Sequence, residues 1–281
     1  MIKICALFSG SSGNSIFITN NCTDETISNS NLHSVPHKGG GILVDAGMSG
    51  KQMQIAMSSI DESLENISGL LITHEHIDHM RGAGVIVRRY KIPLYVNELT
   101  WVKMQKMQIG IIPDDLVNII DNTSDFAIGD YIISSIKTPH DAADSYGYKI
   151  TSGNRTVSVL TDIGEMSMEM LSEIENSDAV FIESNYDKKM LWEGSYPYML
   201  KKRIDGNFGH LSNEDCARSI IHLLNKGTER FILSHLSQEN NLPSVALRET
   251  KKSLENIGSV IDRDVLVQVA KRSCASVPWS F

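Results

Sequence analysis

The stretch GLLITHEHIDH, residues 69–79, decides how this chain folds and where its chemistry lies. Its first five residues form a largely apolar run that predicts a buried strand. The six residues that follow include His74, His76, Asp78 and His79, which are three imidazoles and a carboxylate. Imidazole and carboxylate ligands together suit zinc, manganese or iron. The stretch therefore predicts a metal site at the end of a buried strand.

The spacing of these four side chains predicts two metal positions. In an extended chain, positions 74, 76 and 78 project to one side, and position 79 turns to the same pocket as a helix begins. This places His74 and His76 on one metal, and Asp78 and His79 on another. The pattern differs from the HExxH helix of zincins, whose histidines lie four residues apart. The alternative is a polar loop with chance histidines, which accounts poorly for so dense a run after a buried strand.

Further candidate ligands lie directly after other apolar runs. They are His140, Asp162 and His235, after predicted strands at 131–137, 156–160 and 230–234. Each alone is more often a satisfied polar group. Together they repeat one arrangement, in which a buried strand delivers a ligand to a common rim, and a carboxylate such as Asp162 can bridge two cations. Asp45 ends the apolar run 41–44 in the same way.

The composition is that of an ordinary globular protein of 281 residues, with 41% hydrophobic and 21% charged residues. We expect a single domain over 1–281, with an exposed loop inserted at 20–40. The net charge of −8 gives no overall basic footprint, but bound cations would restore positive charge where a phosphate lies. The apolar runs are shorter than a membrane span of ~18 residues, and the cysteines form no CxxC pair. We therefore expect a cytoplasmic protein with reduced thiols and no membrane contact.

The predicted elements belong to an α/β protein, with early strands in hairpins and later strands mixed with helices. Strands are predicted at 2–8, 15–19, 41–45, 69–73, 93–96, 125–128, 131–137, 146–151, 156–160, 179–183, 230–234 and 264–269. Helices are predicted at 49–59, 79–90, 97–108, 165–175, 186–203, 212–225 and 243–256. The helix at 212–225 begins with a capping box, Ser212–Asp215. This order fits two sheets sandwiched between helices.

Taken together, the candidate ligands resemble the five motifs of the metallo-β-lactamase superfamily. The matching positions are, in order, Asp45, residues 74–79, His140, Asp162 and His235. The resemblance implies an αββα sandwich of two mixed β-sheets flanked by helices, with the site at one edge of the sheets. It implies a first metal with the ligands His74, His76 and His140, and a second with the ligands Asp78, His79 and His235. Asp162 would bridge the metals, and Asp45 would support the ligands from behind.

Longer blocks of the sequence are similar to one branch of that superfamily, the YycJ/WalJ family of bacterial exonucleases. These blocks are residues 9–15, 44–51, 183–187, 209–213 and 234–241. The resemblance implies exonuclease action on double-stranded DNA from the 5′ end, without the cap domain of the larger β-CASP nucleases. The polar loop at 20–40 is longer than is usual in the family. It leaves the ligand set intact.

The resemblance also implies a mechanism. Two divalent metals would share one water and make it a hydroxide near neutral pH, and this metal-bridged hydroxide would attack phosphorus in line. By resemblance we expect manganese, although the ligands would also take zinc or iron. His210 would hold the scissile phosphate or protonate the leaving oxygen, or else only stabilise its turn. Asp78 would orient the hydroxide in addition to binding metal.

Two segments are candidates for contacts with nucleic acid. Ser11 and Asn14, in the glycine-rich turn at 9–14, could donate hydrogen bonds to a substrate phosphate. Tyr196 and Tyr198 lie beside the basic run 201–203 and could stack a base and grip a backbone. Packing beside a solvated charged end explains the tyrosines equally well.

Other activities share such a ligand set. An RNase, thioesterase, lactonase, cyclic phosphodiesterase or β-lactamase would use the same residues, although a cytoplasmic location argues against a secreted β-lactamase. The Gly-His-Leu-Ser block at 209–212 favours the phosphodiester branch by resemblance. Flavodiiron-type redox proteins use a carboxylate where this chain has His76. A non-catalytic scaffold is disfavoured by the intact ligand set, and the oligomeric state is left open.

Overall fold

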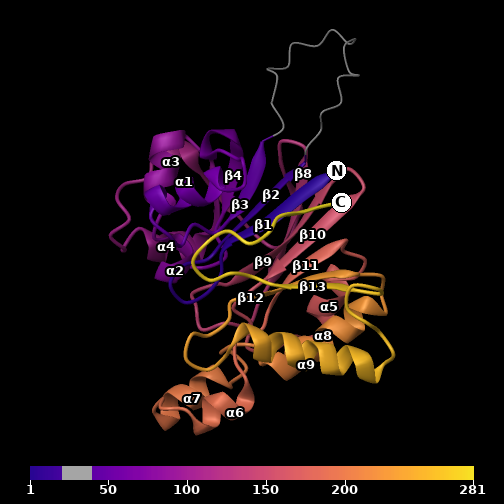
Figure 1. Ribbon diagram of the computed structural model, residues 1–281. Coiled ribbons are helices and arrows are strands. Elements are labelled where there is room, and N and C mark those ends of the chain that lie inside the picture. Colours follow the sequence, from indigo (N-terminus) through magenta and orange to yellow (C-terminus); the bar gives the residue numbers. More distant parts are fainter. Residues whose placement is uncertain (21–39) are drawn as a thin grey trace.

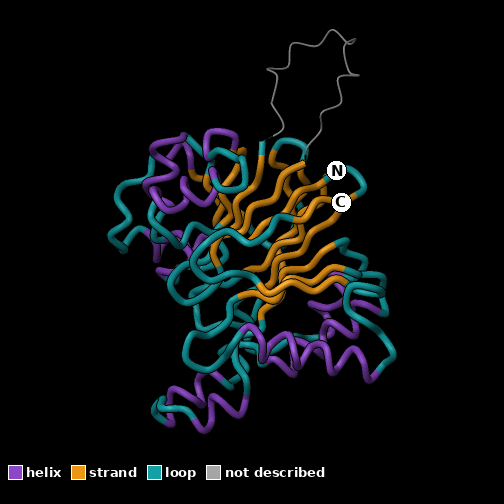
Figure 2. Tube along the Cα trace, viewed as in Figure 1, coloured by secondary structure: helices purple, strands orange, loops and turns teal. Residues whose placement is uncertain are grey.

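The computed structural model describes residues 1–20 and 40–281, and it shows two β-sheets packed face to face between layers of helices (Figure 1, Figure 2). The first sheet has the order β14 (Trp279–Ser280), β1 (Ile2–Phe8), β2 (Ser15–Asn20), β3 (Gly41–Val44), β4 (Ile67–Leu71), β5 (Leu94–Asn97), β6 (Val117–Ile120). The second has the order β13 (Leu266–Val269), β12 (Arg230–Ser234), β11 (Ala179–Glu183), β10 (Arg155–Leu160), β9 (Tyr146–Ser152), β8 (Tyr131–Lys137), β7 (Phe126–Ile128). The expected αββα sandwich is confirmed. Residues 21–39 of the expected loop lie outside the described residues, so that expectation stays a prediction.

Strand direction brings the predicted ligands toward one edge. In the first sheet, β3, β4, β5 and β6 are parallel neighbours. In the second, β10, β11, β12 and β13 are parallel, and β8 runs the same way because both β8 and β10 are antiparallel to β9. The carboxyl ends of parallel strands meet at the same edge of a sheet, where α/β proteins place their sites.

Apolar side chains form layers on both faces of each sheet. Along β1, Ile2, Ile4 and Ala6 pack between the two sheets, whereas Cys5 and Leu7 pack against the helices outside the first sheet. This alternation follows from the pleat of a strand, which turns successive side chains to opposite faces. Because both faces of the sheets are covered, strands such as β1, β2, β3 and β11 are almost continuously buried.

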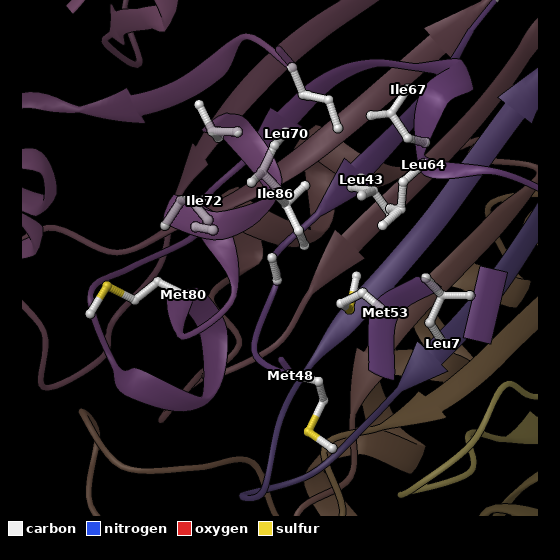
Figure 3. Close-up of a cluster of buried hydrophobic side chains, with 14 of the residues drawn as sticks. Leu7, Leu43, Met48, Met53, Leu64, Ile67, Leu70, Ile72, Met80 and Ile86 are labelled. Carbon is white, nitrogen blue, oxygen red and sulfur yellow. The ribbon is translucent and has the colours of Figure 1, made fainter. Parts of the chain in front are cut away.

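The outer layers hold the helices against the sheets. Outside the first sheet lie α1 (Gly50–Ser58), α3 (Ala83–Tyr90) and α4 (Glu98–Met104), and Figure 3 shows Met53 and Ile86 packing near Leu43 and Leu70 of the strands. Outside the second sheet lie α5 (Met168–Ile174), α8 (Asn213–Leu224) and α9 (Pro243–Asn256). No helix among residues 1–20 and 40–281 is long and apolar enough to cross a membrane.

Two expected helices are each broken in two. The helix expected at 79–90 is α2 (Ile77–Met80) and α3, separated at Gly82, whose N–H donates to the Ala46 carbonyl at 2.7 Å. The helix expected at 186–203 is α6 (Lys188–Glu193) and α7 (Tyr198–Ile204), because Pro197 cannot continue a helix and forces the preceding residue into an extended conformation. The 3₁₀ turns Leu64–Asn66 and Asp114–Leu116, and the edge strands β6 and β14, are additional to the expected elements.

Candidate metal centre

Three strands end in residues with an unusual backbone conformation. Asp45 after β3, Asp162 after β10 and His235 after β12 have φ angles of 64°, 57° and 56°. A residue with a side chain costs about 1–3 kcal/mol in such a conformation, so the surrounding structure must hold it there. All three side chains are buried, with Asp162 Oδ1 lying 3.4 Å from His235 Nδ1. The strand ends thus turn sharply into one polar cluster.

All seven predicted ligands come together in this cluster. One group of donor atoms belongs to His74, His76 and His140, and a second to Asp78, His79 and His235, with the atoms of each group within 4.8 Å of one another. A third group of the same size joins His74 and His79 to Asp162. Asp162 therefore lies between the two other groups, as a shared ligand would.

The donor set fits a divalent metal. The Nε2 atoms of His74 and His235 are buried and have no hydrogen-bond partner among the described residues. The Oδ2 atom of Asp78 lies 3.7 Å from His235 Nε2. Buried polar atoms are normally satisfied, so these nitrogens point to a ligand of another kind. Nitrogen and carboxylate oxygen donors at this spacing are those that zinc, manganese and iron prefer.

The charges of the cluster are strongly coupled. Burial alone would raise the pKa of Asp162, but the imidazoles of His235, His79 and His140 outweigh it and hold that pKa well below its usual value. Burial would lower the pKa of His235, yet Asp162, Asp78 and Glu183 raise it to about 10. In the metal-free protein, the surrounding carboxylates thus favour the protonated form of the His235 imidazole.

Asp45 supports the cluster from behind His79. Its carboxylate lies 2.7 Å from His79 Nδ1 and accepts hydrogen bonds from Thr73 N at 2.9 Å and Thr73 Oγ1 at 2.9 Å. Because Nδ1 of His79 is held by the carboxylate, Nε2 faces the cluster, 3.0 Å from Asp162 Oδ2. Such carboxylate–histidine pairs fix the orientation of metal-binding imidazoles.

Glu183, at the end of β11, is a buried carboxylate that the sequence analysis gave no role. Its Oε1 lies 2.7 Å from His235 Nδ1 and 2.9 Å from His210 Nδ1, and its Oε2 accepts from Ile163 N at 2.7 Å. Burial would lower the pKa of His210, but the Glu183 carboxylate outweighs it and raises that pKa. Glu183 therefore orients one candidate ligand and one candidate catalytic histidine together. Its signal was the apolar run 179–183 ending in a carboxylate, the pattern already noted at Asp45.

The cluster forms the floor of an open pocket of about 240 Å³. Ser11, Asp78 and His210 line this pocket. Asn14 is buried instead, where its Oδ1 accepts from Gly10 N at 2.8 Å and its Nδ2 lies 3.3 Å from Asp78 Oδ2. The structure thus places Ser11 at the pocket and Asn14 behind the candidate ligands.

Comparison with known proteins agrees with this geometry. The model of the beta-lactamase superfamily domain matches residues 41–236. Exodeoxyribonuclease YycJ of Bacillus anthracis is 36% identical over 257 residues, which cover 92% of this chain and 90% of that protein. Exodeoxyribonuclease WalJ of Streptococcus pneumoniae is 37% identical over 245 residues, covering 87% and 85%. The chain belongs to the YycJ/WalJ family of the metallo-β-lactamase superfamily.

Membership of the YycJ/WalJ family makes the chain a metal-dependent hydrolase. A solved structure, the metallo-beta-lactamase fold protein YhfI from Bacillus subtilis, covers 100% of both chains with a TM-score of 0.69 at 16% identity, and it supports the fold alone. The ligand clusters of this YycJ/WalJ-family chain are those expected for divalent metals. Asp141 forms an ion pair with Arg203 at the pocket and was not singled out from the sequence, whereas Arg203 was noted only as part of the basic run 201–203. The two residues lie 62 positions apart in the sequence, and no local pattern predicts their pairing.

Proposed function

We propose that the chain is a metal-dependent exonuclease that cleaves phosphodiester bonds of double-stranded DNA from its 5′ end. The observation that carries the proposal is the set of seven residues with nitrogen and oxygen donors, Asp162 at their centre, on the floor of an open pocket. An open site admits the end of a polymer, and clustered cations neutralise the charge that develops on a phosphate. The exodeoxyribonuclease names of relatives at 36% and 37% identity support DNA as the substrate class.

The proposed ligands divide into two sets that share one carboxylate. His74, His76 and His140 would hold the first metal. Asp78, His79 and His235 would hold the second. Asp162 would contact both, which its place between His74 and His79 supports. When bound, divalent metals supply Lewis acidity and a water of near-neutral pKa, and manganese or zinc would serve.

The protein groups around the metals have separate tasks. His210 lines the pocket, and the Glu183 carboxylate outweighs the effect of burial and raises the pKa of His210, which favours its protonated form. A protonated imidazole there can hold a phosphate oxygen and release its proton to the leaving oxygen. Asp78 also lines the pocket, where its second oxygen would orient the attacking water. Ser11 on the rim would donate a hydrogen bond to a neighbouring phosphate.

A nuclease assay tests this function directly. Double-stranded DNA labelled at either end would be incubated with manganese and the native chain, Asp78→Ala, or the exposed-site control Asp115→Ala. Stepwise loss from the 5′ end should occur with the native chain and the control and disappear with Asp78→Ala. Absence of cleavage of both DNA and RNA by the metal-loaded native chain would refute the proposal. The substrate would then be sought among small esters, thioesters and lactones.

A further inference from the structure

The helices α6 and α7 form an arm, residues 188–204, that protrudes from the sandwich at the lower end of Figure 1. The arm is fastened internally, because Lys201 Nζ donates to the Trp192 carbonyl at 2.9 Å and to the Gly194 carbonyl at 2.7 Å. Trp192 Nε1 also donates to Asp205 Oδ2 at 3.0 Å, just beyond the end of α7. These bonds give the arm a defined shape without a large apolar core.

One side of the arm forms a wall of the candidate site. Tyr196, Leu200, Arg203 and Ile204 line the pocket, at spacings of three and four residues that place the last three on one face of α7. Arg203 is fixed there by its ion pair with Asp141. A strand that leaves the pocket on this side therefore passes α7.

The other side of the arm carries exposed aromatic and apolar surface. Tyr198 is 61% exposed, Met199 75% and Trp192 40%. The Trp192 and Tyr198 rings lie 6.0 Å apart, and Lys202 Nζ lies 5.4 Å from the centre of the Tyr198 ring. Exposed rings next to a free ammonium group are the combination that proteins use to stack bases and hold phosphates of a single strand.

The charge of the arm selects the kind of partner. It holds five cations and one acid, Glu193, for a net charge of +4 in a chain whose net charge is −8. Lys188 is paired with Asp215 at 3.2 Å, and Lys201 donates to backbone carbonyls within the arm. Lys189 and Lys202 are the exposed lysines of the arm that have no carboxylate partner among the described residues. A polyanion matches this surface, whereas a second copy of the arm would repel it.

We infer that the outer face of the arm binds the nucleic-acid strand adjoining the nucleotide in the pocket, with a base stacked on Tyr198 and a phosphate on Lys202. The inference rests on the proposed function and adds to it a surface that recognises polymer. The seven residues of α7 span about 10 Å, or about three steps of a duplex strand. The arm would thus raise affinity for long substrates and leave the chemistry at the metals unchanged.

Two substrates separate the arm from the site. The full chain and the variants Tyr198→Ala and Lys202→Gln would be assayed with a labelled duplex and with bis(p-nitrophenyl) phosphate, which is too small to reach the outer face of the arm. Lys252→Gln, an exposed lysine on α9, is the matched control. Tyr198→Ala should raise KM for the duplex about fivefold or more, the loss expected for one stacked base. Lys202→Gln should reduce the slope of log KM against log salt by about 0.7, the loss of one phosphate contact with an unpaired strand.

The small diester should be hydrolysed equally by all four proteins. Unchanged duplex KM and salt slope in both arm variants would overturn the inference. An equal loss of activity with both substrates would also overturn it, because the outer face of the arm would then act on the chemistry in the pocket. If the native chain hydrolyses the diester but no polynucleotide, the proposed function fails. The role of the arm in binding can still be tested then, by measuring duplex binding in chelator with fluorescence anisotropy. The inference would also be overturned if Tyr198→Ala and Lys202→Gln left duplex binding unchanged. The same holds if the native chain self-associated and either variant abolished that self-association.

Discussion

Gly47 packs so closely against the backbone of Asp78 that one added methyl group should disturb the metal centre. A Cβ at position 47 would lie 1.7 Å from the Asp78 carbonyl oxygen and 2.5 Å from Asn14 N. Those two atoms are themselves hydrogen bonded at 2.7 Å, and Gly47 N donates to the Asn14 carbonyl at 2.9 Å. Real Cβ contacts are essentially never shorter than 3.0 Å, so Gly47→Ala must displace Asp78 or its neighbours by about 1.3 Å.

The displacement falls on two adjacent candidate ligands, Asp78 and His79. A misplacement of about 1 Å in a catalytic group costs about 10²-fold in rate. Overpacking of this kind also costs about 1–3 kcal/mol of stability. We therefore expect Gly47→Ala to fold with a lower free energy of unfolding, to bind one metal at least about tenfold more weakly, and to lose about 10²-fold in hydrolysis of a small phosphodiester.

The assays are metal content by elemental analysis after dialysis at limiting manganese, hydrolysis of bis(p-nitrophenyl) phosphate, and urea denaturation. Gly153→Ala is the control, because Gly153 has a φ of 58° and nothing within 4 Å of its added Cβ. Its backbone strain lowers stability by about 1–2 kcal/mol without moving a ligand. Full metal content and full activity in Gly47→Ala, or losses no larger than in Gly153→Ala, would refute the reasoning.

Three further perturbations test the centre. Asp162→Ala should lose both metals and His140→Ala mainly one, as measured by elemental analysis; full metal content in Asp162→Ala would exclude the shared ligand. Thr73→Val removes a buried hydroxyl that donates to Asp45, so it should lower the free energy of unfolding in chelator by about 1–3 kcal/mol, and an unchanged urea midpoint would contradict this. The pKa of His235 is raised to about 10 in the folded chain, against about 6.5 for an unfolded histidine. In chelator, the charged imidazole therefore contributes its full stability below about pH 6.5, and this contribution is lost progressively up to about pH 10. The urea midpoint should therefore fall over this range, and a flat profile would rule out the charged imidazole.

The ligands were predictable because each lies in a local pattern. An apolar run that ends in histidine or aspartate indicates a strand with a polar tip, and parallel strands place such tips at one edge. The centre could therefore be assembled from 74–79, His140, Asp162 and His235 before any contact was known. Their role as metal ligands stays a prediction, because the structure gives the distances between the donor atoms and not the binding of a metal.

Features that depend on distant contacts could not be predicted in the same way. In β14, Ser280 pairs with Lys3 at the other end of the chain. This strand has only two residues, which is too short for a strand pattern in the sequence. The break at Gly82 reflects a close approach to the Met48 carbonyl, 2.1 Å from where a Cβ would lie. Asn14 could be assigned to the substrate only while its partner Asp78, 64 residues away, was unknown.

The proposed ligand set is divided between the two sheets, and this has a consequence for synthesis of the protein. The first histidines follow β4, whereas His235 follows β12, 161 residues later. At about 5–20 residues per second, a ribosome needs roughly 8–32 s to pass from one to the other. His140 and Asp162 are made within that interval, so the first proposed set is complete early, whereas the second set lacks His235 until the end of it. Capture of the second metal would therefore mark the moment when the second sheet has been made and has docked on the first.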